Sequence, residues 1–153
     1  MSQPVRIRQA CAGTRLCSAA MRIVHLCRHA KAADGDPDEL RELTPKGVEQ
    51  ARALGRRLAT APDRPAFVLT SPLVRAQQTA RIVAEETGAE LRVEPLLAPG
   101  ATLRELQRAV DEVAGPVATV GHQPDCSEIA LAVTGRDPGF PPGGCTTLEL
   151  DAD

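Results

Sequence analysis

The stretch that shows the fold class most directly is residues 67–88, FVLTSPLVRAQQTARIVAEETG. Residues 67–69 form an apolar run with the length of a short buried strand. Ser71 and Pro72 are typical of a helix start, because a hydroxyl can cap free backbone N–H groups and proline suits the first helical turn. Apolar residues at helical spacing then continue to Gly88, a typical helix end. The stretch therefore predicts a buried strand followed directly by a helix.

The same alternation continues through the chain from Met21 onward. It predicts further strands at residues 23–27, 91–93, 117–120 and 147–150, and further helices at about 45–61 with Thr44 as the cap, at 102–113 and at 125–134. Such alternation is typical of α/β folds. We expect a three-layer sandwich in which helices flank a mostly parallel central sheet.

Length and composition limit the class of protein. The chain has 153 residues, 42% of them hydrophobic and 25% charged, with a formal net charge of -2. These values predict one folded domain and argue against intrinsic disorder. Aromatic residues make up only 1% of the chain, so it has few groups on which nucleic-acid bases could stack. We expect a monomer with neither a nucleic-acid partner nor a membrane span.

The first 20 residues differ from the rest in charge. They contain Arg6, Arg8 and Arg15 but no acidic residue, and they lack the long apolar run of a signal peptide or membrane span. A strand-like run begins directly after Met21. We expect residues 1–20 to be a disordered extension or the result of a mis-assigned translation start, and residues 21–153 to be the folded domain. A transit peptide is a weaker alternative, and the expected location is the cytoplasm.

Several common site types are excluded by spacing. The cysteines at 11, 17, 27, 126 and 145 form no CxxC pair, and none has an arginine six residues later, as a cysteine phosphatase requires. We therefore expect free thiols in a reducing compartment. His25 and His29 would lie about 13 Å apart on a strand, which is too far to share a metal. Neither GxxxxGK[ST] nor GxGxxG occurs, so we expect no metal and no cofactor, and any phosphate must be held by side chains.

Polar motifs follow three of the predicted strands. Arg28 and His29 come after the first strand, Arg75 after the second and His122 after the fourth. The carboxyl ends of parallel strands meet at one edge of a sheet, where α/β proteins bind ligands. Arginine and helix amino-termini both favour anions. The pattern predicts a phosphate pocket, although each residue taken alone could equally occupy a surface or turn position.

Four segments, in their order and spacing, resemble the histidine phosphatase superfamily, also called phosphoglycerate-mutase-like. They are residues 28–31 (RHAK), 43–51 (LTPKGVEQA), 70–80 (TSPLVRAQQTA) and 120–124 (VGHQP). The resemblance runs from Met21 nearly to the end of the chain. The short length is similar to that of the SixA branch of phosphohistidine phosphatases. The resemblance implies a phosphoglycerate-mutase-like sandwich and phosphatase activity.

The same resemblance implies a role for each matched residue. His29 would accept the phosphoryl group, while Arg28, Arg75 and His122 would bind its oxygens and complete the catalytic set. Arg41 is a further candidate for substrate binding. Fixed positive charge can stabilise a transferred phosphoryl group without a metal. His29 must be neutral to act as a nucleophile, whereas we expect His122 to be a cation whose pKa is raised beside phosphate.

The chain departs from the superfamily pattern at two places. Ala30 stands where relatives carry glycine after the RH motif. The general acid of mutase and phosphomonoesterase relatives, a glutamate between the second helix and the GH motif, has no clear counterpart. Asp34, Asp36 and Glu105 are the candidates that remain.

The missing acid bears on the expected substrate. Imidazole leaves more readily than an alkoxide, so phosphohistidine needs less help from an acid than a phosphoester does. We expect a metal-independent phosphatase that acts on phosphohistidine of a partner protein. A small-molecule phosphomonoesterase of the same superfamily and a non-catalytic phosphate-binding module are the alternatives.

Overall fold

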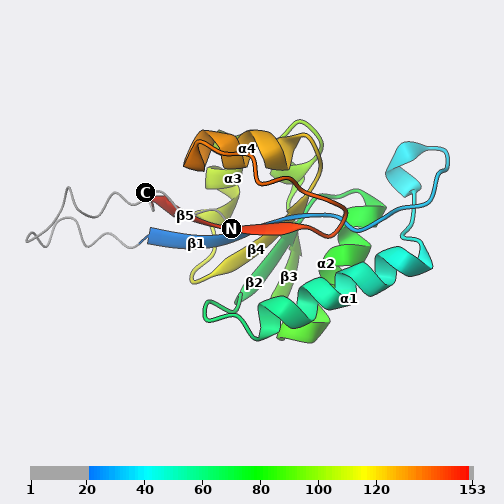
Figure 1. Cartoon of the computed structure of the whole chain (residues 1–153), viewed down its shortest axis with the longest axis horizontal. Helices are drawn as coiled ribbons and strands as arrows, with labels where there is room; N and C mark the ends of the chain where they lie inside the picture. Colours follow the sequence, from blue (N-terminus) through cyan, green and yellow to red (C-terminus); the bar gives the residue numbers. More distant parts are fainter. Residues whose placement is uncertain (1–20, 152–153) are drawn as a thin grey trace, which may run out of the picture.

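The computed structural model describes residues 21–151, which form a central sheet with helices on both faces (Figure 1). The strands are β1 (Met21–Arg28), β2 (Phe67–Thr70), β3 (Glu90–Val93), β4 (Val117–Gly121) and β5 (Cys145–Asp151). The helices are α1 (Pro45–Ala59), α2 (Val74–Thr87), α3 (Leu103–Val110) and α4 (Asp125–Thr134), with the 3-10 helices η3 (Asp38–Leu40) and η4 (Pro95–Leu97). The expected extension, residues 1–20, lies outside the described residues.

The strands form one sheet in the order β3-β2-β4-β1-β5. The pairs β1 with β4, β4 with β2 and β2 with β3 are parallel, whereas β5 runs antiparallel to β1 at the edge of the sheet. Parallel neighbours need long crossover connections, which the helices provide here. The expected three-layer α/β sandwich with a mostly parallel sheet is confirmed.

Each face of the sheet carries its own aliphatic core. On the face covered by α1 and α2, the buried residues include Leu54, Leu58, Ala80, Val83 and Val120. On the face covered by α3 and α4, they include Leu26, Leu69, Leu106, Val110 and Ile129. Side chains of this kind stabilise the fold through removal of apolar surface from water. Among the helices of residues 21–151, none is both long and apolar enough to cross a membrane.

Two helix ends differ from the sequence prediction. Helix α2 begins at Val74 with Leu73 as its N-cap residue, and no side chain caps it. Ser71, which the sequence suggested as the cap, instead lies in the preceding loop and accepts the N–H of Leu73 at 3.2 Å. Helix α3 ends at Val110 rather than Val113, and Thr102, the first residue of the predicted helix, is its N-cap residue.

The loops after β1, β2 and β4 leave the sheet at one edge. The backbone N–H of His29 donates to the carbonyl of Gly121 at 3.0 Å, and that of Ser71 donates to the carbonyl of Val120 at 3.0 Å. These bonds continue the sheet pairing one residue beyond the strands. As a result, side chains far apart in the sequence come together at this edge.

Candidate active site

His29, Arg75 and His122 meet at the carboxyl edge of the sheet, as the sequence predicted. The rings of His29 and His122 have centroids 5.2 Å apart. All three side chains are buried, with residue exposures of 9%, 7% and 4% for His29, Arg75 and His122. The site therefore holds a guanidinium and two imidazoles largely out of water, where electrostatic interactions are strong.

The two partners of His29 determine which of its nitrogens carries the proton. Nδ1 lies 2.8 Å from the carbonyl oxygen of Ala30, which can only accept, so Nδ1 carries the hydrogen and donates. Nε2 accepts from Nε of Arg75 at 3.3 Å. An arginine has no lone pair to offer, so the lone pair of His29 lies on Nε2. Nε2 is therefore the nucleophilic atom of the ring.

The surroundings of His29 keep its ring neutral. Burial lowers the pKa of His29 to about 4, and the positive charges of Arg75, Arg28 and Arg41 lower it as well, against the opposing effect of the hydrogen bond to Ala30. At neutral pH the ring is uncharged and its lone pair is available. This state is the one that nucleophilic attack requires.

Arg75 uses each of its three nitrogens. Besides the bond from Nε to His29, Nη1 donates to the backbone carbonyl of Asp38 at 2.9 Å and Nη2 donates to the Asp38 carboxylate at 3.1 Å. Arg28 is held differently, because its Nη1 donates to the carbonyl of Phe140 at 3.0 Å. Its Nε is buried and has no hydrogen-bond partner among the described residues.

His122 contacts the loop after β2. Its Nε2 lies 2.7 Å from Oγ of Ser71, while its Nδ1 is buried without a hydrogen-bond partner in the described part of the chain. Burial lowers the pKa of His122 to about 4, and the nearby His29 and Arg75 lower it further. The raised pKa expected from the sequence concerns His122 beside a bound phosphate and stays a prediction, whereas in the protein alone the burial of the ring is the largest influence on its pKa.

Helix α2 and helix α1 hold the loop that follows His29. Oγ1 of Thr79 accepts the N–H of Ala30 at 3.0 Å and donates to the carbonyl of Arg75 at 2.9 Å. Thr79 therefore links the backbones of the two segments that carry Arg75 and His29. The Lys31 N–H donates to Oε1 of Gln50 in α1 at 2.9 Å, which fixes the next residue of the loop.

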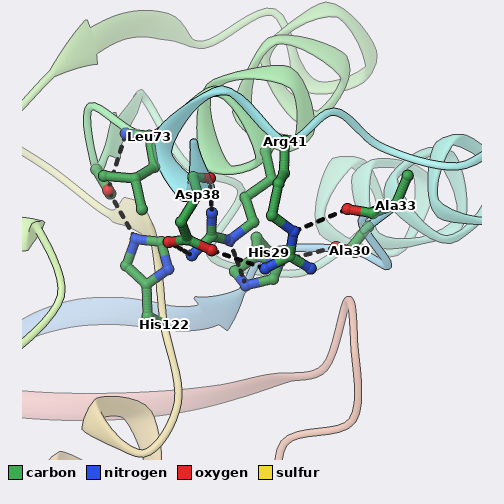
Figure 2. A network of polar contacts seen from close by, with 9 residues as sticks. His29, Ala30, Ala33, Asp38, Arg41, Leu73 and His122 are labelled. Carbon is green, nitrogen blue, oxygen red and sulfur yellow. Dashed lines mark hydrogen bonds and ion pairs between the residues drawn. The ribbon is translucent and has the colours of Figure 1, made fainter. Parts of the chain in front are cut away.

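Asp38 is a site residue that the sequence reasoning missed. Its carboxylate accepts from Nη2 of Arg75 at 3.1 Å and from Nη1 of Arg41 at 2.9 Å. Figure 2 shows this carboxylate between the ring of His122 and the side chain of Arg41. Hydrogen bonds from Arg41 and Arg75 hold the pKa of Asp38 below its ordinary value. A signal was present in the sequence: Asp38 and Arg41 have opposite charges three residues apart, in the loop directly after His29.

Arg41 lies close to the other positive groups, as its candidacy for substrate binding requires. Its Nε donates to the carbonyl of Ala33 at 2.8 Å, so the guanidinium is anchored within its own loop.

None of the three candidates for the general acid makes a contact with His29 among the hydrogen bonds of the described residues. Asp34 and Asp36 are exposed in the same loop, whereas the Glu105 carboxylate accepts the N–H of Thr102 at 2.9 Å in the capping box of α3.

The described residues contain no group of three His, Cys, Asp or Glu side chains that could hold a metal ion. What they place together is a neutral imidazole, with its lone pair on Nε2 facing Arg75, and the guanidinium groups of Arg28, Arg41 and Arg75. This arrangement combines a nucleophile with fixed positive charge and suits attack on a phosphoryl group.

Comparison with known proteins identifies the family. The family model described as "Histidine phosphatase superfamily (branch 1)" matches residues 24–111. An uncharacterised protein of Picosynechococcus is 40% identical over 107 residues, covering 67% of this chain and 62% of that protein. The mitochondrial serine/threonine-protein phosphatase Pgam5 of Drosophila persimilis is 42% identical over 66 residues, covering 42% of this chain and 23% of Pgam5. The chain thus spans less than two thirds of the length of these relatives.

A solved structure extends the likeness over most of the fold. The crystal structure of a candidate phosphohistidine phosphatase SixA from Agrobacterium tumefaciens superposes with a TM-score of 0.72 at 27% identity, covering 83% of this chain and 90% of that one. The family model and the solved structure agree, and the chain belongs to branch 1 of the histidine phosphatase superfamily, with a SixA-like fold.

Proposed function

We propose that this chain is a phosphatase that passes a phosphoryl group through Nε2 of His29, and that its substrate is phosphohistidine on a protein. The observation that carries the proposal is the state of His29. Its proton is held on Nδ1 by the Ala30 carbonyl, and its lone pair on Nε2 faces Arg75. A buried, neutral, oriented imidazole is the form that can attack phosphorus.

The first step exchanges one N–P bond for another. Nε2 of His29 attacks the phosphorus as the bond to the substrate imidazole breaks. The substrate ring, protonated on its other nitrogen, keeps the bonding electrons and leaves as a neutral imidazole, so no acid has to supply a proton. Arg75, Arg28 and His122 are proposed to bind the three phosphoryl oxygens during transfer. Fixed donors of this kind stabilise the transition state because they need no reorganisation during the reaction.

The second step is hydrolysis of the phosphohistidine formed on His29. Water attacks phosphorus, the bond to Nε2 breaks with its electrons returning to the ring, and inorganic phosphate leaves. The ring then returns to the neutral state that its burial favours. Neither step requires a strong acid for the leaving group, which agrees with the exposed positions of Asp34 and Asp36 and with the capping role of Glu105.

The substrate assignment rests on the leaving group and on the SixA-like fold. A protein-borne phosphohistidine has a good leaving group, whereas an alkyl phosphoester does not. The test is to compare release of phosphate from a phosphohistidine protein and from a small alkyl phosphomonoester, with a metal chelator present. The proposal predicts faster turnover of the phosphohistidine protein, and faster turnover of the alkyl ester would contradict it in favour of a phosphomonoesterase.

The role of His29 is tested by substitution. His29→Ala is expected to lose activity on every phosphorylated substrate and to form no acid-labile phosphoenzyme. His25→Gln is the matched control, because His25 is a buried histidine of the preceding strand β1 that contacts Thr147 and the Asp63 carbonyl rather than the site. Phosphate binding without turnover in the unaltered protein would instead support the alternative of a non-catalytic phosphate-binding module.

A further inference from the structure

The Asp38 carboxylate lies where the chain has gathered its positive charge. Arg75 and Arg41 each donate one nitrogen to it, at 3.1 and 2.9 Å, one to each carboxylate oxygen. Two guanidinium groups that share one oxyanion resemble the arrangement that proteins use to bind phosphate. The carboxylate thus sits in an anion position adjacent to the nucleophilic Nε2 of His29.

Both arginines keep their positions by contacts that do not involve this carboxylate. Arg75 is fixed by Nε on His29 and by Nη1 on the backbone carbonyl of Asp38. Arg41 is fixed by Nε on the carbonyl of Ala33. The Asp38 side chain could therefore leave while both guanidinium groups remain in place and present the freed nitrogens to another oxyanion.

Burial differs sharply between the partners. The side chain of Arg75 is 8% exposed, whereas that of Asp38 is 58% exposed. Asp38 thus reaches the site from the solvent side, on η3, and can turn outward without disturbing the core. Because the Asp38 carboxylate remains in contact with water, salt and solvent partly screen its attraction to the guanidinium groups, and an anion with more charge can take its place.

We propose that Asp38 is a built-in competitor for the phosphoryl position: the substrate's phosphoryl group displaces its carboxylate, and its return helps to expel inorganic phosphate. This inference rests on the proposed function and adds a residue that determines specificity. A tethered carboxylate competes at an effective concentration of about millimolar. Free phosphate has only the contacts of its own oxygens with which to displace the Asp38 carboxylate. A phosphoryl group on a protein also gains binding energy from contacts made by that protein.

The test measures the binding of inorganic phosphate by calorimetry, which requires no turnover. Asp38→Asn removes the charge and keeps the side-chain shape, and it is expected to bind phosphate about fivefold more tightly, because the half-exposed carboxylate no longer competes for the two arginines. Inhibition of turnover by phosphate is expected to strengthen by the same factor. Asp38→Ser, which removes the carboxylate altogether, should give the same change.

The control is Glu39→Gln, which removes one negative charge from the same 3-10 helix and leaves Arg75 and Arg41 with their partners. It should bind phosphate as the unaltered protein does. Equal or weaker binding by both Asp38 variants would overturn the inference, since it would mean that Asp38 only positions the arginines. Equal tightening in Glu39→Gln would overturn it too, because a general charge effect would then suffice.

A crystal structure of the unaltered protein with tungstate, an analogue of phosphate, is a second test of the inference. The inference expects the anion on Nη2 of Arg75 and the Asp38 carboxylate turned away, whereas a carboxylate that stays on Arg75 beside bound tungstate would contradict it. Failure of the proposed function would look different. It would appear as a lack of His29-dependent turnover, with the effect of Asp38 on phosphate binding unchanged.

Discussion

Nε of Arg75 donates to Nε2 of His29 across 3.3 Å, so the most buried cation of the site points at its nucleophilic lone pair. This contact keeps protons off Nε2 and orients the ring toward the remaining donors. A phosphoryl group that binds Nε2 would meet Arg75 directly. In the proposed mechanism, Arg75 would orient His29 before attack and bind the phosphoryl oxygens during it.

The first prediction concerns the shape of Arg75. Arg75→Lys keeps the positive charge but cannot supply three nitrogens to His29, to the Asp38 carbonyl and to an oxyanion at once. We expect kcat to fall by roughly 100-fold, the size of effect found when one donor to transition-state charge is lost. Steady-state kinetics on a phosphorylated protein would measure it.

Arg81→Lys is the matched control, because Arg81 is an exposed residue of the same helix. Its kinetics should equal those of the unaltered protein. Full activity of Arg75→Lys would show that charge alone is sufficient, and the three-contact argument would have to be abandoned.

The second prediction concerns stability at low pH. The pKa values of His29 and His122 are lowered from 6.5 to about 4 in the folded protein, so between these values the unfolded chain binds more protons. Stability is therefore fully present above pH 6.5 and is lost as the pH falls toward 4. For a single histidine the loss by pH 4.5 is roughly 2 to 3 kcal/mol.

Urea unfolding at pH 7 and at pH 4.5 would measure this loss. His29→Asn and His122→Asn should each reduce the difference between the two pH values, since each removes one titrating group. Because the two rings lie 5.2 Å apart, the two effects should not add. An unchanged pH dependence in both variants would refute the assignment.

Much of the fold was predictable from local sequence patterns, and the features that were not predicted have a common physical reason. The sequence predicts the strands, the cap at Thr44 and the meeting of His29, Arg75 and His122 at one edge. These features depend on short apolar runs, on a capping residue and on parallel topology, which the sequence displays directly. Their chemical roles remain a proposal.

Ser71 and Asp38 depend on partners far along the chain. Ser71 was expected to cap α2, but its hydroxyl contacts His122, which is 51 residues away. Asp38 reaches Arg75, which is 37 residues away. No periodicity in the sequence indicates such pairs, and the burial of His122 among positive neighbours, which lowers its pKa, is likewise a tertiary property.

The third prediction concerns Thr79, which joins the loop of His29 to helix α2. Thr79→Val keeps the shape of the side chain but leaves the N–H of Ala30 buried without its acceptor. We expect a loss of about 1 to 3 kcal/mol in the free energy of unfolding and a lower kcat, because the residue after His29 is no longer fixed. Thr79→Ser retains the hydroxyl and should preserve most of both quantities. If the Val variant matches the Ser variant in urea unfolding and in turnover, the hydrogen bond has no such role.

The last prediction concerns the close approach of α1 to the same loop. A Cβ atom placed on Gly47 would lie 2.1 Å from the carbonyl oxygen of Lys31, far inside van der Waals contact. That oxygen also accepts the N–H of Thr44 at 3.0 Å, so it cannot move without disturbing both the helix start and the loop after His29.

Gly47→Ala is therefore expected to destabilise the protein by about 1 to 3 kcal/mol, despite the higher helix propensity of alanine. The loop after His29 should shift, so kcat should fall as well. Gly35→Ala is the matched control, because a Cβ there would meet only Cγ of Arg41 at an ordinary 3.7 Å. Thermal unfolding and phosphate release should separate the two variants. Equal stability would mean that the loop yields to the added methyl group, and a retained kcat would then show that the position of Lys31 does not control His29.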